Sequence, residues 1–226
     1  MHLVGILLML FNILTVKNSM KIYDISWPIF NGMTTYKDRG GVKIEATKIF
    51  ERDGVRESSI TIGSHTGTHI DAPAHFIQEG RSLEEINPLA CVGPATVVDM
   101  MHIQERISEH DLQHISKDSR NILLFKTRNS EHKSHELFDQ DFVYLDESGA
   151  RYLVQCFPQA IGIDYLGVER AQIKHETHVL LLQNNIPIIE GLRLQHVPPG
   201  DYFLWCLPLN IPGIDAVPAR AILIEA

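Results

Sequence analysis

Short stretches in which apolar and polar residues alternate recur along this chain, and they predict β-strands. The clearest is 42–49, where valine, isoleucine and alanine alternate with lysine, glutamate and threonine. A period of two is typical of a strand that buries one face. Alternation or short apolar runs predict further strands at 21–26, 56–62, 95–98, 122–125, 161–164, 186–189, 202–207 and 219–224.

Three segments carry helix signals instead. The tetrapeptide 108–111, Ser-Glu-His-Asp, resembles a capping box and opens a short helix. Ser148 is placed to cap a second helix that reaches Phe157, and a third is predicted over 173–184. Because the strands and helices mix without the regular alternation of a doubly wound sheet, we expect one mixed α+β domain over 20–226.

Two stretches fall outside this pattern. The polar stretch 129–141 contains two histidines with metal-like spacing, but its composition predicts a solvated surface loop. Residues 1–19 are mostly apolar, yet the run is too short for a membrane span and has neither the basic start nor the cleavage site of a signal peptide. We expect 1–19 to be an extension outside the fold and a membrane role to be unlikely. If the extension belongs to the native protein, membrane tethering or export is the alternative.

Charge and cysteine content narrow the range of functions. The formal net charge of −8 disfavours a protein that binds nucleic acid by neutralising phosphates. The three cysteines form no Cys-x-x-Cys pair, so no cysteine-based zinc site is visible, and their apolar surroundings predict buried thiols in a reducing compartment such as the cytoplasm. A small molecule is the expected ligand.

The densest chemistry lies in the segment 64–76, which reads Ser-His-Thr-Gly-Thr-His-Ile-Asp-Ala-Pro-Ala-His-Phe. His65, His69, Asp71 and His75 share the same parity, so an extended chain would turn all four to one face. Imidazole nitrogens and a carboxylate oxygen suit Zn²⁺, Mn²⁺ or Fe²⁺. The segment therefore predicts a metal site with an acid–base group beside it.

This segment cannot be a straight strand or a helix. Six residues at about 3.3 Å each span roughly 20 Å, too far for one ion to join the ends. Pro73 argues against a helix interior. Gly67 is free to adopt positive φ and is the expected bend that gathers the side chains.

Two residues further along the chain are candidates to complete the site. His178 lies on the helix predicted over 173–184. Glu190 ends the apolar strand predicted at 186–189, where a carboxylate is costly to bury without a partner. Each also has an ordinary structural explanation, His178 as a residue of the helix surface and Glu190 as half of a salt bridge.

With these positions in place, the chain resembles the cyclase family, which contains bacterial kynurenine formamidases and isatin hydrolases. The histidine segment carries most of the resemblance, which extends over nearly the whole chain from Met20. Weaker matches support it at 23–26, 93–95, 161–164, 188–192, 206–209 and 218–221. The resemblance implies a single-domain swivelling β/β/α-type fold, with strands around the metal site and helices outside, and a homodimer or larger assembly.

The resemblance also implies roles for matching residues. His65, His69 and Asp71 would bind one metal, and Asp71, His178 and Glu190 a second, with Asp71 bridging. Two Zn²⁺ per chain are expected, with Mn²⁺ as the alternative. His75 matches the histidine that serves as acid and base in the family.

The activity implied is metal-dependent hydrolysis of a non-peptide amide bond. The expected substrate is an aryl formamide such as N-formylkynurenine, attacked by a metal-activated water with His75 as general acid and base. One alternative is ring opening of a cyclic amide or lactone, as in isatin hydrolases, with a single Mn²⁺ held chiefly by His65, His69 and Asp71. Another is a metal-binding module without turnover.

The chain departs from the formamidase pattern after its first strand. Those enzymes commonly carry an aromatic residue followed by Pro-Gly there, whereas residues 33–38 read Met-Thr-Thr-Tyr-Lys-Asp. Tyr36 takes the place of the aromatic residue and is the candidate substrate-binding residue. The departure bears on the choice of substrate rather than on the reaction.

Overall fold

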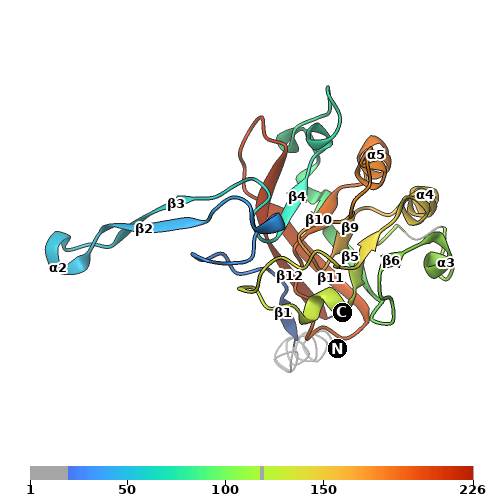
Figure 1. The fold of residues 1–226 in the computed structure, drawn as a ribbon, viewed down its shortest axis with the longest axis horizontal. Helices are drawn as coiled ribbons and strands as arrows, with labels where there is room; N and C mark the ends of the chain where they lie inside the picture. Colours follow the sequence, from blue (N-terminus) through green and yellow to red (C-terminus); the bar gives the residue numbers. More distant parts are fainter. Residues whose placement is uncertain (1–19, 118–119, 226) are drawn as a thin grey trace, which may run out of the picture.

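The computed structural model describes residues 20–117 and 120–225. Seven strands form a closed ring at its centre, and Figure 1 shows how the other elements are arranged around them. Each strand pairs with the next, and the last pairs again with the first, which closes the ring. In ring order these strands are β12 (Ala216–Glu225), β11 (Gly200–Pro208), β5 (Val92–Asp99), β7 (Ile122–Lys126), β9 (Ile161–Ile163), β10 (Ile188–Glu190) and β4 (His69–Asp71). The predicted apolar extension, residues 1–19, lies outside the described residues.

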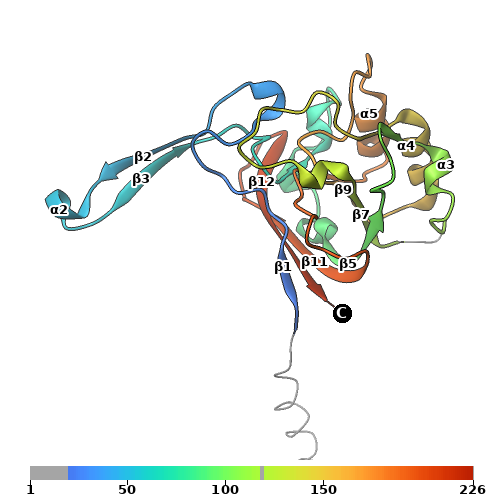
Figure 2. The same ribbon diagram turned by 60° about the horizontal axis from the view of Figure 1, so that its bottom comes forward.

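The ring has a parallel half and an antiparallel half. β5, β7, β9 and β10 run parallel, whereas β4, β12 and β11 pair antiparallel with their neighbours, and β1 (Ile22–Asp24) adds to the outside of β12. The helices α3 (Glu109–Leu112), α4 (Glu147–Cys156) and α5 (Glu176–Gln183) occur in the connections of the parallel half and gather on one side of the ring (Figures 1 and 2). The prediction that strands and helices are mixed is confirmed. In the parallel half, however, βαβ crossovers alternate helices with strands, whereas an α+β fold keeps the two apart.

Alternation along the strands divides the core into two layers. Leu124, Ile189 and Leu204 belong to the cluster inside the ring. Leu123 and Ile188, their neighbours along β7 and β10, belong to a second cluster that includes residues of α4 and α5. β7 is therefore buried on both faces, which explains why its sequence is an uninterrupted apolar run.

All nine predicted strands are present, with ends shifted by at most three residues. The pattern missed the short pair β6 (Arg106–Ile107) and β8 (Tyr144–Leu145). It also missed the single-turn 3₁₀ helices, which are too short to show a period. These are η1 (Tyr36–Asp38), η2 (Pro73–His75), η3 (Leu83–Glu85), η4 (Pro88–Cys91) and η5 (Arg128–Glu131).

Helix starts differ in part from prediction. The capping box that opens α3 is confirmed, since the Ser108 backbone N–H donates to Asp111 Oδ2 at 2.8 Å. The cap of α4 is not Ser148 but Asp146, whose carboxylate accepts the Gly149 N–H at 2.9 Å. α5 begins three residues later than predicted because His175 takes a left-handed φ of 53°.

The prediction of a solvated loop at 129–141 is wrong for its first residues. Asn129 and Ser130 are buried beside Asp164, whose carboxylate accepts from the Ser130 N–H and hydroxyl at 3.1 and 2.6 Å. The same carboxylate accepts from the Thr127 N–H and hydroxyl at 2.7 and 2.8 Å. A buried carboxylate needs such hydrogen-bond donors. The local sequence of the loop does not indicate that its first residues pair with Asp164, which lies on another segment.

The strand at 42–49 also differs from its pattern. β2 (Lys43–Lys48) pairs only with β3 (Glu57–Thr61), and this hairpin, with α2 (Phe50–Asp53) at its tip, projects away from the ring (Figures 1 and 2). Its alternation predicts one buried face, yet apart from the partly covered Ile44 both strands are exposed among the described residues. An isolated two-stranded hairpin is only marginally stable in water.

Two glycines allow the histidine segment to lie against β10. Gly67 has a φ of 62° and is the bend that was expected. Gly191, with a φ of 70°, follows Glu190, and a Cβ there would lie 2.3 Å from the Gly67 carbonyl oxygen. Thr68 stabilises the contact between the Gly67 and Gly191 segments. Its hydroxyl donates to the Gly191 carbonyl at 2.5 Å and accepts the Trp27 N–H at 2.7 Å.

Gly191→Ala should therefore destabilise the protein by about 3 kcal/mol or more, since a methyl group would force the two backbones apart. Gly213→Ala is the matched control, because its φ of 73° is similar but its Cβ would meet nothing within 4 Å. That control should lose only about 1–2 kcal/mol. Urea unfolding measures both, and equal losses would contradict the close approach.

Candidate metal centre and active site

β4 and β10 place three of the predicted residues on one face. The strands pair antiparallel, with His69 opposite Glu190. Ile70 and Ile189 project into the cluster inside the ring, so the residues beside them project to the other face. His69, Asp71 and Glu190 therefore lie on the outer face of the ring wall. The expectation that strands enclose the site is corrected to this extent, because the inward positions are apolar.

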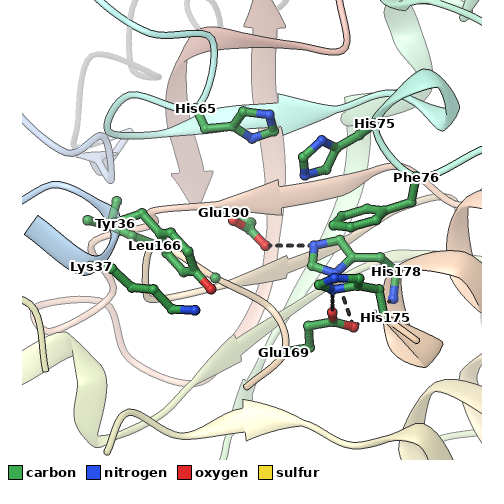
Figure 3. A pocket seen from close by; sticks show the side chains of 11 residues that line it. Tyr36, Lys37, His65, His75, Phe76, Leu166, Glu169, His175, His178 and Glu190 are labelled. Atoms are coloured by element: carbon green, nitrogen blue, oxygen red, sulfur yellow. Dashed lines mark hydrogen bonds and ion pairs between the residues drawn. The ribbon is translucent and has the colours of Figure 1, made fainter. Parts of the chain in front are cut away.

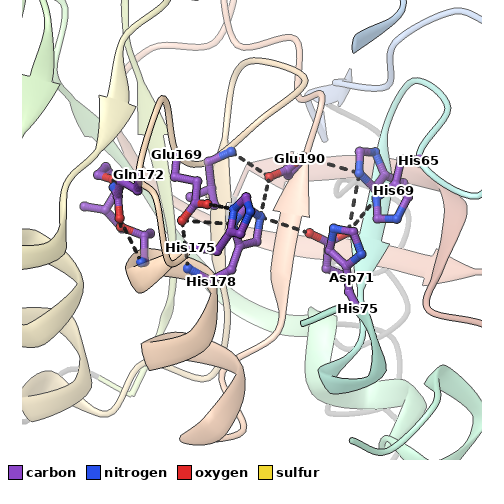
Figure 4. A network of polar contacts seen from close by, with 12 residues as sticks. His65, His69, Asp71, His75, Glu169, Gln172, His175, His178 and Glu190 are labelled. Carbon is purple, nitrogen blue, oxygen red and sulfur yellow. Dashed lines mark hydrogen bonds and ion pairs between the residues drawn. The ribbon is translucent and has the colours of Figure 1, made fainter. Parts of the chain in front are cut away.

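His178 reaches the same place from the first turn of α5 (Figure 4). Its Nε2 lies 3.6 Å from Asp71 Oδ2 and 3.4 Å from Glu190 Oε1. Glu190 is held from the other side by the Val168 N–H, which donates to Oε1 at 2.6 Å. The structure thus brings His178 and Glu190 onto Asp71, as the resemblance implies.

His65 completes the cluster on the opposite side of Asp71. Its Nδ1 lies 3.1 Å from Asp71 Oδ1, and the same oxygen lies 3.4 Å from His69 Nε2. His69 Nε2 is also 3.4 Å from Glu190 Oε2. All five residues predicted as metal ligands therefore lie in one cluster, with Asp71 between the His65–His69 pair and His178.

The unsatisfied atoms of this cluster fit a metal. Asp71 is fully buried, yet neither of its oxygens has a hydrogen-bond partner among the described residues, and the same holds for His69 Nε2. The other ring nitrogen of His69 lies 2.9 Å from the Gly67 carbonyl, which leaves Nε2 as the free lone pair. Donors about 2.1 Å from a tetrahedral ion lie roughly 3.4 Å apart, close to the separations seen here.

Four groups of three residues in the described part of the chain are near enough to hold one ion each, and two of these groups share Asp71. His65, His69 and Asp71 offer atoms within 4.8 Å of one another, as do Asp71, His75 and His178. His75, expected as an acid–base group, is thus a member of the second group, while Glu190 contacts His69 and His178. A nitrogen and oxygen donor set of this kind suits Zn²⁺ or Mn²⁺.

The close contacts within this cluster shift the pKa values of its histidines and carboxylates. Burial opposes charge at His65, but the neighbouring carboxylates of Asp71 and Asp215 raise its pKa to about 9. Burial and the Asp71 charge oppose ionisation of Glu190, yet the neighbouring His178 and His69 lower its pKa to about 2. Against the cost of burial, contacts with Asp71, Glu169 and Glu190 raise the pKa of His178 well above its usual value. Without a metal, these shifts favour protonated rings at His65 and His178, which balance the carboxylates.

His75 lies beside this cluster, on η2 rather than on an extended strand. Its ring centre is 4.1 Å from that of His65, and its Nδ1 lies 3.5 Å from Asp215 Oδ2. Burial is the main reason that the pKa of His75 is lowered. A neutral imidazole with an oriented nitrogen is suited to accept a proton near pH 7.

The sequence-based reasoning missed three residues of this site. Asp215 Oδ2 lies 2.9 Å from His65 Nε2, and Asp215 precedes β12, which pairs with β4. Glu169 is buried with one oxygen 2.5 Å from His175 Nδ1 and the other 3.1 Å from His178 Nδ1. Asp215, Glu169 and His175 belong to no local motif. Glu169 is buried, and a carboxylate is costly to bury unpaired.

A pocket of about 320 Å³ opens over the cluster (Figure 3). His65, His75, His178 and Glu190 line its floor side, and its remaining walls include the apolar surfaces of Tyr36, Phe76 and Leu166. Tyr36 packs edge-on against Phe138 with ring centres 5.1 Å apart. The site therefore has room for a small aromatic molecule above a group of metal-binding and acid–base side chains.

Comparison with known proteins agrees with this description. The family model described as "Putative cyclase" matches residues 23–170. A kynurenine formamidase from Bacillus cereus is 32% identical over 202 residues, covering 88% of this chain and 95% of that protein. A solved structure from Bacillus stearothermophilus, described as a "predicted metal-dependent hydrolase", is 41% identical with a TM-score of 0.82, covering 92% of this chain and 100% of that one.

The fold is shared more widely. Isatin hydrolase A from Ralstonia solanacearum is 22% identical with a TM-score of 0.78, covering 98% of this chain and 97% of that one. The chain belongs to the cyclase family, and it is an enzyme of the metal-dependent amidohydrolase class. Within the described ranges, no helix is both long and apolar enough to cross a bilayer.

The metal-free protein should lose stability as pH rises from 6.5 to 9. His65 is about a quarter exposed, and its pKa is raised to about 9 in the folded state. A raised histidine pKa stabilises the fold fully below the unfolded pKa of about 6.5, and this contribution vanishes as pH rises through the folded pKa. The loss should be on the order of 2–3 kcal/mol.

Urea unfolding across this pH range, in the presence of a chelator, measures the effect. His65→Gln removes the titrating ring, so this variant should show a flatter profile. A metal-free wild type whose stability stays constant or rises between pH 6.5 and 9 would contradict the charge balance described above.

Proposed function

We propose that this enzyme hydrolyses an aryl formamide, of which N-formylkynurenine is one example. The observation that carries the proposal is the aromatic-walled pocket directly above the His–Asp–Glu cluster, with His75 at its edge. Similarity to kynurenine formamidases over most of both chains supports the same reaction. Formamidases commonly carry an aromatic residue followed by Pro-Gly after the first strand. This chain lacks the Pro-Gly, and Tyr36 takes the place of the aromatic residue, so we assign Tyr36 to substrate binding.

Two metal ions, most simply Zn²⁺ with Mn²⁺ as the alternative, are proposed for this cluster. His65, His69 and Asp71 would hold one ion, and Asp71, His178 and Glu190 the other. The support is the position of Asp71, whose two oxygens face different histidines. A bound metal supplies a Lewis acid that polarises the amide carbonyl and lowers the pKa of a water molecule.

The protein's own groups handle the protons. Neutral His75 accepts a proton from the attacking water as the water oxygen bonds to the formyl carbon. It then donates that proton to the amide nitrogen as the C–N bond breaks, releasing the aromatic amine and formic acid, which loses its remaining proton to solvent and becomes formate. Asp215, which contacts both His75 and His65, orients the ring for both transfers.

We also propose a homodimer or larger assembly and a cytoplasmic location. The projecting hairpin and the outer face of β11 support self-association, because Phe203, Trp205 and Leu207 are 37–45% exposed where a solvated strand would carry polar residues. The three cysteines are all free and buried, which suits a reducing compartment.

A substrate panel tests the proposed reaction. Purified enzyme loaded with Zn²⁺ or Mn²⁺ should release formate from N-formylkynurenine and other formanilides, while isatin and simple lactones should react more slowly. Cleavage of isatin or lactones alone, with one ion per chain, would favour the ring-opening alternative. No turnover of any compound with Zn²⁺, Mn²⁺ or Co²⁺ would overturn the proposal in favour of a binding module. Two ions per chain, with one lost in Glu190→Gln, would agree with the metal assignment.

His75→Ala should lower kcat about 10²–10⁴-fold while leaving the metal content unchanged, because the residue moves protons and is not assigned as a ligand. His110→Ala is the control, since His110 is 91% exposed and remote from the pocket. Formate release and elemental analysis of the same preparations give both readouts. Unchanged turnover would remove His75 from the mechanism, and lost metal would make it a ligand.

A further inference from the structure

The pocket wall formed by η1 carries a cation that the proposed reaction does not use. Lys37 lines the pocket beside Tyr36, on the side facing Phe76 and His178 in Figure 3. Among the described residues that line this pocket, it is the one lysine or arginine. The contact recorded for its ammonium group is with the Tyr36 ring, 5.0 Å away, and no ion pair with a described carboxylate is formed.

The backbone at this point is held in an unusual conformation. Lys37 and Asp38 have φ values of 52° and 54°, in the left-handed region that favours glycine. Consecutive non-glycine residues persist there only when the surroundings impose the conformation, and such residues cluster at ligand-binding sites. The conformation therefore needs a cause outside η1 itself.

That cause is a set of contacts with the segment 134–138. Asp38 Oδ1 accepts the Phe138 N–H at 2.9 Å, and the Tyr36 ring packs against Phe138. Before η1, the Thr34 N–H donates to the Ser134 carbonyl at 2.8 Å and the Thr34 hydroxyl to the Glu136 carbonyl at 2.7 Å. The turn is thus fixed at both ends, and both exposed side chains between these anchors face the pocket.

We propose that Lys37 binds the carboxylate of the substrate, so that this enzyme prefers aryl formamides bearing an anionic side chain. Tyr36 and Phe76 offer flat apolar surfaces to the ring, and an ammonium group at the pocket edge offers a charge-assisted hydrogen bond to a carboxylate. The inference rests on the proposed function, because it concerns how the same pocket selects its substrate.

A matched pair of substrates tests the preference. 4-(2-Formamidophenyl)-4-oxobutanoate and its methyl ester share the scissile bond and differ in charge. Lys37→Met should raise KM for the carboxylate about tenfold, with kcat changed less than about twofold, and leave the ester unaffected. Lys37→Arg should retain most of the affinity. Lys43→Met is the charge-matched control, since Lys43 lies on the hairpin and pairs with Glu45.

Binding of the amine product provides a readout that does not require turnover. The Zn²⁺-loaded protein should bind 4-(2-aminophenyl)-4-oxobutanoate, and the Kd should rise about tenfold in Lys37→Met. Added salt should also weaken the affinity of the wild type. If the wild type cleaves neither substrate but binds the product through Lys37, the anion site stands and the proposed reaction fails. If both substrates are cleaved and Lys37→Met affects them equally or not at all, with an unchanged Kd, the reaction stands and the anion site is overturned.

Discussion

The burial of two carboxylates side by side on the outer wall of the ring is the constraint on which the rest of the site depends. Asp71 and Glu190 are both buried, and like charges at such proximity are costly without compensation. His65, His69 and His178 surround them and supply that compensation, either as protonated imidazoles or as neutral ligands of a cation. In the arrangement that we propose, the same five side chains would stabilise the metal-free protein through protons and the metal-loaded protein through coordination.

The backbone around this cluster is built to hold it rigidly. The ring closes through β4, a strand of only three residues that pairs with both β10 and β12. The close approach of Gly191 to Gly67 leaves no space between the two segments that carry the donors. Behind His178, Glu169 fixes the start of α5, because it accepts the His178 backbone N–H and faces its Nδ1. Orienting contacts of this kind keep a histidine ligand in one tautomer.

The local patterns that identified strands and the histidine segment failed where burial is decided by a distant partner. The stretch 129–141 is polar, yet its first residues are buried because Asp164 needs their donors. The strand 43–48 alternates as if one face were covered, yet among the described residues both of its faces are exposed apart from the partly covered Ile44. Asp215 stands alone in its segment and contacts His65 only because β12 pairs with β4. Hydrophobic periodicity records which positions are suited to burial, but not which segment provides the cover.

The sequence by itself determined the strand pattern, the density of imidazole and carboxylate groups between 64 and 76, and the family to which the chain belongs. Those features are local, since they depend on side-chain periodicity and on residue types within a few positions of one another. The tertiary structure decided that Glu190 lies opposite His69 and that Asp215 and Glu169 complete the surroundings. It also decided that Lys37 faces the pocket. These contacts join segments far apart in the chain, and only strand register and packing bring them together.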